Sequence, residues 1–422
     1  MTPEPGPEPR PESRPGAVPG SPAPLDVEAL RRDTPGTAFG IHLNNAGAAL
    51  QPAAVLKAVH DHLQAETELG GYEAAAARAD EIAGAYRSVE ELLGARQGSI
   101  AFTENATVAF QQALSSIRLA PGDRILTSRQ DYVSNQLMYL SLAERLGVEV
   151  ERAPDAPEGG IDVGAVREAL IRRRPRVVAL SHIPTSSGVV QDAGAVGALC
   201  REHGVPYILD ACQSVGQMPL EPESLGCSFL AATSRKFLRG PRGAGFLWVS
   251  RQALKDGLVP LFPDLRSADW VEEDLWQPAP DASRFENWEF SWALVLGTGA
   301  AAEVARATGL EAIRDRARSL AHRLREGLGG VRGVQVLDRG RELAAIVTIT
   351  VEGWRPSDLV RHLRERSIRT SSVDRSSAVI DYDERGIPAA LRLSPHAYNT
   401  EDEIDEAVEA LRHAASFPRE SA

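Results

Sequence analysis

Lys236 is the residue whose type and position most suggest chemistry. The chain has 46 lysine and arginine side chains, yet only Lys57, Lys236 and Lys255 are lysines. A lysine amine that is buried, or that lies beside other cations, can lose its proton and add to a carbonyl carbon as a Schiff base, whereas a guanidinium stays charged. Lys236 follows the apolar run FLAATSR, and three nearby arginines supply positive charge. This context favours a covalent catalytic lysine over an ordinary surface lysine.

An acidic residue at the end of another apolar run gives the lysine a partner. The segment PYILDACQ places Asp210 at the end of a predicted strand, followed by Gln213. A carboxylate can keep the ring nitrogen of a pyridine cofactor protonated while a lysine holds the aldehyde of that cofactor as an imine. Asp210 alone fits a helix cap or a turn better. Together with Lys236 and Gln213 it indicates a pyridoxal-type cofactor.

A phosphate group on such a cofactor requires an anion site. The segment FTENATVAF runs from a short strand through Asn105, Ala106 and Thr107 into a predicted helix, where free amides and the helix dipole attract anions. Thr233 and Arg235, just before the lysine, are expected to complete this cradle. Asn and Thr are also ordinary residues at a helix N-terminus, so this loop indicates a phosphate site only in combination with Lys236 and Asp210.

Short apolar runs alternate with helix-length segments over most of the chain. The runs are SIAFTEN, DRILTSR, RVVALSHI, PYILDAC, FLAATSR and GAGFLWVS, and an amphipathic segment such as 190–203 separates two of them. This alternation predicts an α/β fold with a mostly parallel sheet flanked by helices. Active-site residues of such folds gather at the carboxyl ends of the strands.

The composition of the chain predicts four segments. Residues 1–25 form a proline-rich tail that we expect to be disordered, because nine of the first 24 residues are proline. Residues 26–45 form an N-terminal arm, and 46–296 form a large cofactor-binding domain. Residues 297–417 form a smaller α+β domain, whose last helix begins with a threonine cap and an acidic first turn in TEDEIDEAVEALRHAA.

Charge and cysteine content exclude several classes of function. A net charge of -12 argues against a nucleic-acid partner, which requires a concentrated basic surface. Cys200, Cys212 and Cys227 have neither the number nor the spacing for a zinc site or a disulfide framework, so we expect no metal and a reducing cytoplasm. No run of 18 apolar residues and no signal-peptide core is present, so no membrane partner is expected. A small-molecule substrate is the expectation.

The same motifs carry a family resemblance from about His42 to Arg412. HLNNAGAA, DACQ and SRK together resemble the class V aminotransferase-like enzymes, which use pyridoxal 5'-phosphate in fold type I and include cysteine desulfurases, carbon-sulfur lyases and isopenicillin N epimerase. The resemblance implies a seven-stranded sheet, and a homodimer whose subunits share their active sites. It assigns Asp210 to the pyridine nitrogen, Gln213 to the ring hydroxyl and Lys236 to the Schiff base.

Further site residues follow from this resemblance alone. Tyr132 falls where a histidine usually stacks on the cofactor ring, and an aromatic face over a cationic pyridinium is favourable. Arg392 in ALRLSPHAYN corresponds to the arginine that binds the substrate carboxylate, a task that suits a planar guanidinium. Asn45, in the opening loop, is expected to contact the substrate. Thr185, in LSHIPTSSG, stands where desulfurases have an asparagine near substrate and cofactor.

The segment RFENWEFS also departs from the family pattern, because it replaces a small Gly-Thr loop that reaches the phosphate of the partner subunit. Ser291 is expected to retain that contact. Trp288 adds a large aromatic side chain, which either packs in the dimer interface or shapes a pocket for a bulky substrate.

The reaction expected from the resemblance is carbon-sulfur β-elimination. Desulfurases require a thiolate nucleophile in the loop before the carboxylate arginine, but the corresponding stretch, SIRTSSVDRSSAVIDYDERG, has serines and no cysteine. We therefore expect a β-lyase acting on an S-substituted cysteine, which yields a thiol, pyruvate and ammonia. We expect a role in secondary metabolism, as for relatives in ergothioneine and lincosamide assembly.

Four alternatives stay open at this stage. One is an epimerase, with Tyr132 or His396 as the second proton donor, and two others are an aminotransferase and a decarboxylation-coupled oxidative deaminase. The fourth is a relative without catalytic activity that binds cofactor or a partner.

Overall fold

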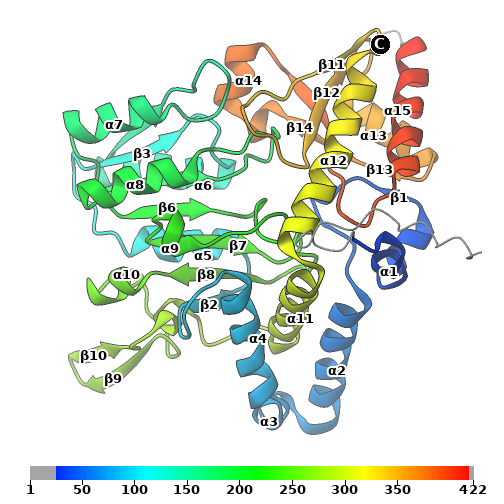
Figure 1. Ribbon diagram of the computed structural model, residues 1–422. Coiled ribbons are helices and arrows are strands. Elements are labelled where there is room, and N and C mark those ends of the chain that lie inside the picture. The colour runs from blue at the N-terminus through cyan, green and yellow to red at the C-terminus, as the bar shows by residue number, and fades with distance from the viewer. Residues whose placement is uncertain (1–24, 418–422) are drawn as a thin grey trace, which may run out of the picture.

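A seven-stranded sheet forms the centre of the larger part of the molecule in the computed structural model, which describes residues 25–417 (Figure 1). The strand order is β2-β8-β7-β6-β5-β3-β4, and only β8 runs antiparallel to its neighbours. In chain order the strands are β2 (Ile100–Thr103), β3 (Arg124–Ser128), β4 (Glu149–Ala153), β5 (Val177–Ser181), β6 (Tyr207–Asp210), β7 (Phe229–Thr233) and β8 (Gly245–Val249). This architecture confirms the predicted mostly parallel sheet.

All six apolar runs became strands, and the strand that the sequence analysis did not identify is β4. Its sequence, EVERA, buries only Ala153, because β4 is the outermost strand and pairs only with β3. An edge strand can leave most of its side chains in water, so its hydrophobic signal is weak.

Helices cover both faces of this sheet (Figure 1). Along β5, Val178 and Leu180 pack into one apolar cluster with α2, α4, α7, α8 and α11, while Val177 and Ala179 pack into another with α5 and α6. The helices of this part are α2 (Ala53–Leu69), α3 (Gly71–Ala77), α4 (Ala79–Leu92), α5 (Ala106–Ser115), α6 (Val133–Leu146), α7 (Val163–Arg172), α8 (Ala193–His203), α9 (Pro222–Leu225), α10 (Arg251–Lys255) and α11 (Trp292–Thr308). A strand buried on both faces is typical of a parallel sheet, which explains the continuous apolar runs in the sequence.

A smaller α+β part follows α11. Its antiparallel sheet has the order β11-β12-β15-β14, and its apolar core lies between that sheet and α12, α13 and α15. The elements are α12 (Leu310–Gly329), β11 (Val334–Val336), β12 (Val347–Val351), α13 (Pro356–Glu365), β14 (Ser371–Asp374), η3 (Arg375–Ser377), α14 (Val379–Arg385), β15 (Ala389–Leu393) and α15 (Glu401–Ser416). The expected domain boundary at residue 297 falls within α11. The predicted cap of the last helix is present, because Thr400 and Glu403 form a capping box.

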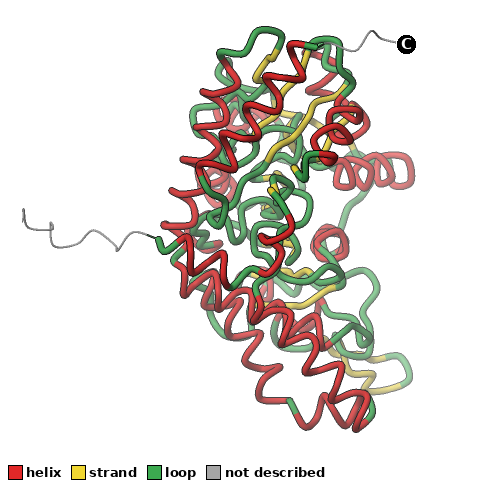
Figure 2. The backbone as a smooth tube through the Cα atoms, turned by 90° about the vertical axis from the view of Figure 1, so that its right-hand side faces the viewer, coloured by secondary structure: helices red, strands yellow, loops and turns green. Residues whose placement is uncertain are grey.

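The N-terminal arm contacts both parts of the molecule, because Leu25 and Leu30 pack against the apolar core of the large part and the strand of the arm pairs with a strand of the small part. It contains α1 (Val27–Arg32), η1 (Pro35–Phe39) and β1 (Ile41–His42), and β1 pairs in parallel with β13 (Ile368–Arg369). Figure 2 shows the same molecule from the side.

The predicted disorder of the tail concerns residues that lie, apart from Leu25, outside the described part of the chain. Among residues 25–417, no helix combines the length and apolar character needed to cross a bilayer.

A hairpin projects from the large sheet. Strands β9 (Ala268–Glu272) and β10 (Leu275–Pro278) form it, and it leads through η2 (Ala282–Phe285) toward α11 (Figure 1).

Candidate active site

A cavity of about 430 Å³ lies at the carboxyl ends of the parallel strands β5, β6 and β7. This is the edge of an α/β sheet where ligands usually bind. The cavity wall includes ten of the residues predicted from the sequence: Asn105, Ala106, Thr107, Tyr132, Thr185, Asp210, Gln213, Thr233, Arg235 and Lys236. The structure therefore brings together side chains from segments more than 130 residues apart.

Lys236 lies in the turn that follows β7, and its side chain is buried. Burial lowers the pKa of the Lys236 amine, because a charged ammonium is poorly solvated there. The Nζ atom lies 5.8 Å from the centre of the Tyr132 ring, so the amine and the predicted stacking residue face the same space. A lowered amine pKa increases the fraction of the free nucleophile at neutral pH.

Asp210 is the last residue of β6 and is oriented by two N–H donors. Its Oδ1 accepts the backbone N–H of Cys212 at 3.0 Å, and its Oδ2 accepts from Asn135 Nδ2 at 3.2 Å. The Ser181 hydroxyl lies 3.5 Å from Oδ2. A carboxylate held this way keeps a fixed position from which it can bind a protonated ring nitrogen.

The N-terminus of α5 lies at the cavity, where the sequence predicts an anion cradle. The Asn105 side chain caps the helix by accepting from Val108 N at 3.0 Å, which leaves the N–H groups of Ala106 and Thr107 outside the hydrogen-bond ladder of the helix. Gly245 on β8 permits this arrangement, because a Cβ atom there would lie 2.6 Å from the backbone nitrogen of Ala106. The geometry suits a phosphate group at the helix N-terminus.

A chain of polar contacts leads from the cavity into the small part of the molecule. Gln213 Nε2 donates to Thr185 Oγ1 at 3.2 Å, and Arg392 Nη1 donates to the same oxygen at 2.6 Å. The Nε atom of Arg392 also donates to Ser371 Oγ at 3.1 Å. Burial lowers the pKa of this guanidinium to about 10, so it remains positive at neutral pH. Arg392 does not line the cavity itself, and Thr185 stands between it and the predicted cofactor site.

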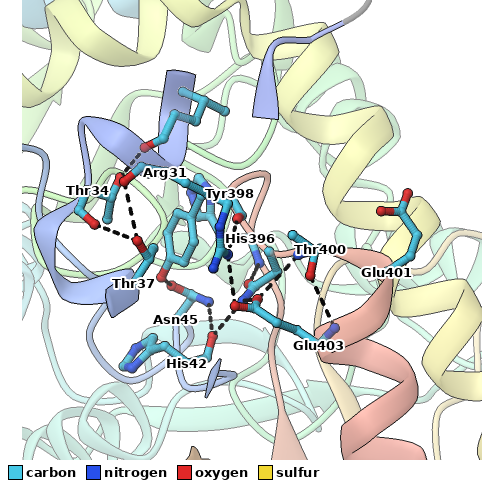
Figure 3. A network of polar contacts seen from close by, with 12 residues as sticks. Arg31, Thr34, Thr37, His42, Asn45, His396, Tyr398, Thr400, Glu401 and Glu403 are labelled. Atoms are coloured by element: carbon cyan, nitrogen blue, oxygen red, sulfur yellow. Dashed lines mark hydrogen bonds and ion pairs between the residues drawn. The ribbon is translucent and has the colours of Figure 1, made fainter. Parts of the chain in front are cut away.

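Asn45 lies outside the cavity wall, although we expected it to contact the substrate. Its Nδ2 donates to the carbonyl of Ser394 at 2.7 Å, and its Oδ1 accepts from the Tyr398 hydroxyl (Figure 3). Both ends of the amide are thus occupied by the junction between the N-terminal arm and the small part. Its neighbour Asn44 lies nearer the site, because Asn44 Oδ1 is 3.5 Å from Arg392 Nη2.

Ser291 and Trp288 also lie outside the cavity of this chain. Ser291 is the residue before α11, and its side chain does not cap that helix. The Trp288 side chain is 45% exposed, and its backbone N–H donates to Asp264 Oδ2 at 2.7 Å. The predicted contact of Ser291 concerns the phosphate of a partner subunit, so it remains a prediction.

Four cavity residues were not identified from the sequence: Asn135, Ser181, Ile183 and Cys212. Ser181 and Ile183 are in the predicted strand segment RVVALSHI, whose end at the same edge of the sheet was a usable signal. Asn135 lies one turn into α6, and nothing in the sequence indicates that it turns toward Asp210. Burial, followed by the nearby Asp210, raises the pKa of the Cys212 thiol well above its usual value.

Comparison with known proteins agrees with this geometry. The family model of aminotransferase class V matches residues 41–407. A probable hercynylcysteine sulfoxide lyase of Mycobacterium tuberculosis is 30% identical over 377 residues, covering 88% of this chain and 89% of that protein. A probable cysteine desulfurase of Methanothermobacter thermautotrophicus is 27% identical over 397 residues, covering 92% and 98%.

Solved structures share the fold at lower identity. The apo structure of a cysteine desulfurase from Thermococcus onnurineus NA1 matches with a TM-score of 0.85 and 23% identity, covering 94% of this chain and 99% of that one. A cystine C-S lyase in complex with cysteine persulfide matches with a TM-score of 0.80 and 23% identity, covering 90% and 99%. At these identities the likeness establishes the architecture.

Proposed function

Because the chain belongs to the aminotransferase class V family, we propose that it is a carbon-sulfur β-lyase that acts on an S-substituted cysteine. The observation that carries this proposal is the convergence of Lys236, Asp210 and the Arg392–Thr185 pair on one site, in a chain whose segment 367–386 has no cysteine. The relatives named above, a sulfoxide lyase and a desulfurase, support a substrate that is a cysteine derivative and whose carbon-sulfur bond is cleaved.

Membership in this family confirms the expected cofactor, pyridoxal phosphate, and the cavity fits it. A helix N-terminus is available for the phosphate, a carboxylate for the ring nitrogen and an amine for the aldehyde. Gln213 Oε1 is buried without a partner in the described part of the chain, which leaves a polar atom free beside the site. When bound, the cofactor supplies an electron sink that stabilises the carbanion left by loss of the substrate α proton.

The residues of the chain then perform three tasks. The Lys236 amine accepts the α proton of the substrate, because burial favours its neutral form. Arg392 binds the substrate carboxylate together with the Thr185 hydroxyl, which it already contacts. Asp210 stabilises the protonated form of the ring nitrogen through its negative charge.

The three cysteines argue against sulfur transfer as the reaction. Cys200 and Cys227 are buried in the apolar core of the large part, and burial raises the pKa of Cys200 to about 12. Cys212 lines the cavity, but its raised thiol pKa makes it a weak nucleophile. The segment 367–386, before Arg392, contains no cysteine.

His396 argues against epimerisation, which needs a second proton donor. Its ring is stacked between Phe237 and Tyr398, at centroid distances of 5.8 Å and 5.2 Å. Both ring nitrogens have backbone contacts, and burial lowers the His396 pKa to about 3. This imidazole does not line the cavity, so Tyr132 is left as the only one of the two named candidates there.

A homodimer in the cytoplasm remains part of the proposal. The hairpin and the loop before it expose large apolar side chains that a second subunit would cover, and Phe262 and Trp270 are 78% and 80% exposed. The large apolar side chains exposed along residues 261–288 are Leu261, Phe262, Leu265, Trp270, Val271, Leu275, Trp276 and Trp288. Such a concentration of exposed apolar side chains is typical of a protein interface.

A product screen tests the proposed reaction. Purified protein loaded with pyridoxal phosphate is incubated with cysteine thioethers and their sulfoxides, and pyruvate, ammonia and the sulfur product are measured by mass spectrometry. We expect pyruvate and the sulfur product in equal amounts from at least one conjugate, and none with Lys236→Ala. Cys212→Ser should retain the activity.

Two outcomes would contradict the proposal. One is exchange of the α proton with solvent and inversion of the amino acid, without pyruvate. The other is a persulfide on Cys212 with alanine as the co-product when free cysteine is the substrate, because that is sulfur transfer rather than elimination.

A further inference from the structure

Asp131 is a buried carboxylate directly behind the cavity wall, and no step above uses it. It precedes Tyr132, the residue before α6, and only 7% of it is exposed. It does not line the cavity. It lies between Tyr132 and β5, and burying an isolated charge costs free energy of folding, so the carboxylate needs partners there.

Five donors surround the two carboxylate oxygens. The Oδ1 atom accepts from Tyr132 N at 2.7 Å, from Ser181 Oγ at 2.7 Å and from Asn135 Nδ2 at 3.1 Å. The Oδ2 atom accepts from Thr127 Oγ1 and from the Tyr139 hydroxyl, both at 2.9 Å. The N–H groups of Tyr132 and Asn135 can only donate, and the three hydroxyls can rotate so that they donate as well, so these surroundings favour the ionised form of Asp131.

Two of these groups also lie close to Asp210. The Asn135 amide nitrogen carries two protons and donates to both carboxylates, to Asp131 Oδ1 at 3.1 Å and to Asp210 Oδ2 at 3.2 Å. The single proton of Ser181 Oγ goes to the nearer Asp131 oxygen, and Asp210 Oδ2 lies 3.5 Å from the same hydroxyl. Asn135 therefore bridges the two carboxylates, and Asp131 also fixes the backbone of Tyr132. Asp131 thus contacts the backbone of Tyr132, the predicted stacking residue, and the side chain that donates to Asp210, the predicted partner of the ring nitrogen.

The charged and titratable groups around Asp131 are few. Asp210 lies across the bridging amide, Tyr139 donates directly, and Arg152 is near enough for its pKa to respond to the Asp131 charge. Burial raises the Asp131 pKa, while the hydrogen bonds from Ser181, Asn135 and Thr127 oppose that rise. We expect the five donors to keep the group ionised at neutral pH.

We propose that Asp131 is a positioning residue that fixes Asp210 and Tyr132 and whose negative charge strengthens proton binding by the cofactor. This inference rests on the cofactor site of the proposed function but not on its substrate. A second negative charge behind Asp210 raises the pKa of a protonated nitrogen in the cavity, because opposite charges attract more strongly inside a protein than in water.

The test is a pH titration of the visible absorption of the loaded enzyme without substrate. In Asp131→Asn, the titration midpoint should fall by about one pH unit, the shift expected when one charge is removed at a separation of several ångströms. The new amide nitrogen would face N–H donors and can impair folding. Asp131→Ser is therefore tested as well, since it removes the charge and leaves room for water, and the same fall is expected.

Matched variants separate the effect of the charge from that of a structural disturbance. Asp155→Asn removes a half-buried carboxylate, whose contact is with Gln130 Nε2 at 2.7 Å, and should leave the midpoint unchanged. Tyr139→Phe removes one donor but keeps the Asp131 charge, so it should lower thermal stability with little change in the midpoint. A folded Asp131→Asn or Asp131→Ser with the wild-type midpoint would overturn the inference. Absence of the visible band in the wild type would instead contradict the proposed cofactor site.

Discussion

Lys236 and Arg239 lie three residues apart in the same turn, yet they belong to two buried polar regions of opposite character. Lys236 faces the cavity. Arg239 belongs to a junction network, defined here as Thr34, Asn45, Arg239, His396 and Tyr398, which ties the N-terminal arm to the rest of the molecule. Figure 3 shows Thr34, Asn45, His396 and Tyr398 of this network. The Arg239 guanidinium donates to Thr34 and to the Leu50 carbonyl, and it lies 4.8 Å from the centre of the Tyr398 ring.

The difference between these regions is whether the buried polar groups surround an open space. In the junction network, donors and acceptors pair within a packed interior, which is what buried polar groups need for stability. In the cavity, an amine, a carboxylate and a helix N-terminus converge on a space of about 430 Å³ instead, although Asp210 also has hydrogen-bond donors behind it. Polar groups that converge on an open cavity are typical of a ligand site, so changes in the two regions should separate function from stability.

Arg392→Lys should produce the larger functional effect. The variant keeps the charge but loses the planar pair of donors, so the KM for the cysteine conjugate should rise about tenfold to a hundredfold, as for a lost charged hydrogen bond. The kcat should change less, because the contact with the carboxylate is present in both ground and transition states. Steady-state kinetics with the conjugate found in the product screen measure this.

Arg375→Lys is the matched control, since this arginine is exposed and pairs with Asp383 in the same part of the chain. It should leave the KM unchanged. If Arg392→Lys and Arg375→Lys both retain the wild-type KM, Arg392 does not bind the substrate carboxylate.

Tyr398→Phe should act on stability alone. The change removes the hydroxyl that donates to Asn45 Oδ1 and leaves a buried acceptor without its partner, which costs about 1–3 kcal/mol of the free energy of unfolding. Chemical denaturation of the protein without cofactor measures the loss. The visible band and the KM should match those of the wild type.

A higher KM in Tyr398→Phe, with unchanged stability, would revive the sequence-based prediction that Asn45 contacts the substrate. That result would also remove the distinction between the junction network and the cavity.

The strands and the main cavity residues could be predicted because their signals are local. A buried parallel strand is a continuous apolar run, and a residue directly after it must lie at the carboxyl edge of the sheet, as Asp210 and Lys236 do. The edge strand β4 escaped prediction because a strand exposed to water loses that pattern.

The residues that were missed act through contacts between distant segments. Asp131 and Asn135 are ordinary polar residues in the sequence, and only the packing of α6 against β5 and β6 brings them to Asp210. Asn45 was identified in the sequence but lies outside the cavity wall, and its contact with the substrate remains a prediction. The loop that contains it was recognised, but whether Asn44 or Asn45 faces the site depends on the direction of each side chain, which two adjacent asparagines do not reveal.

Reductive trapping of the cofactor tests the central claim most directly. Borohydride treatment of the loaded enzyme, followed by peptide mapping, should place the pyridoxyl label on Lys236 alone. The other two lysines serve as internal controls, because Lys57 is exposed and pairs with Asp61, and Lys255 lies in the last turn of α10. Label on either of those lysines with Lys236 unmodified, or no label on any lysine, would contradict the account.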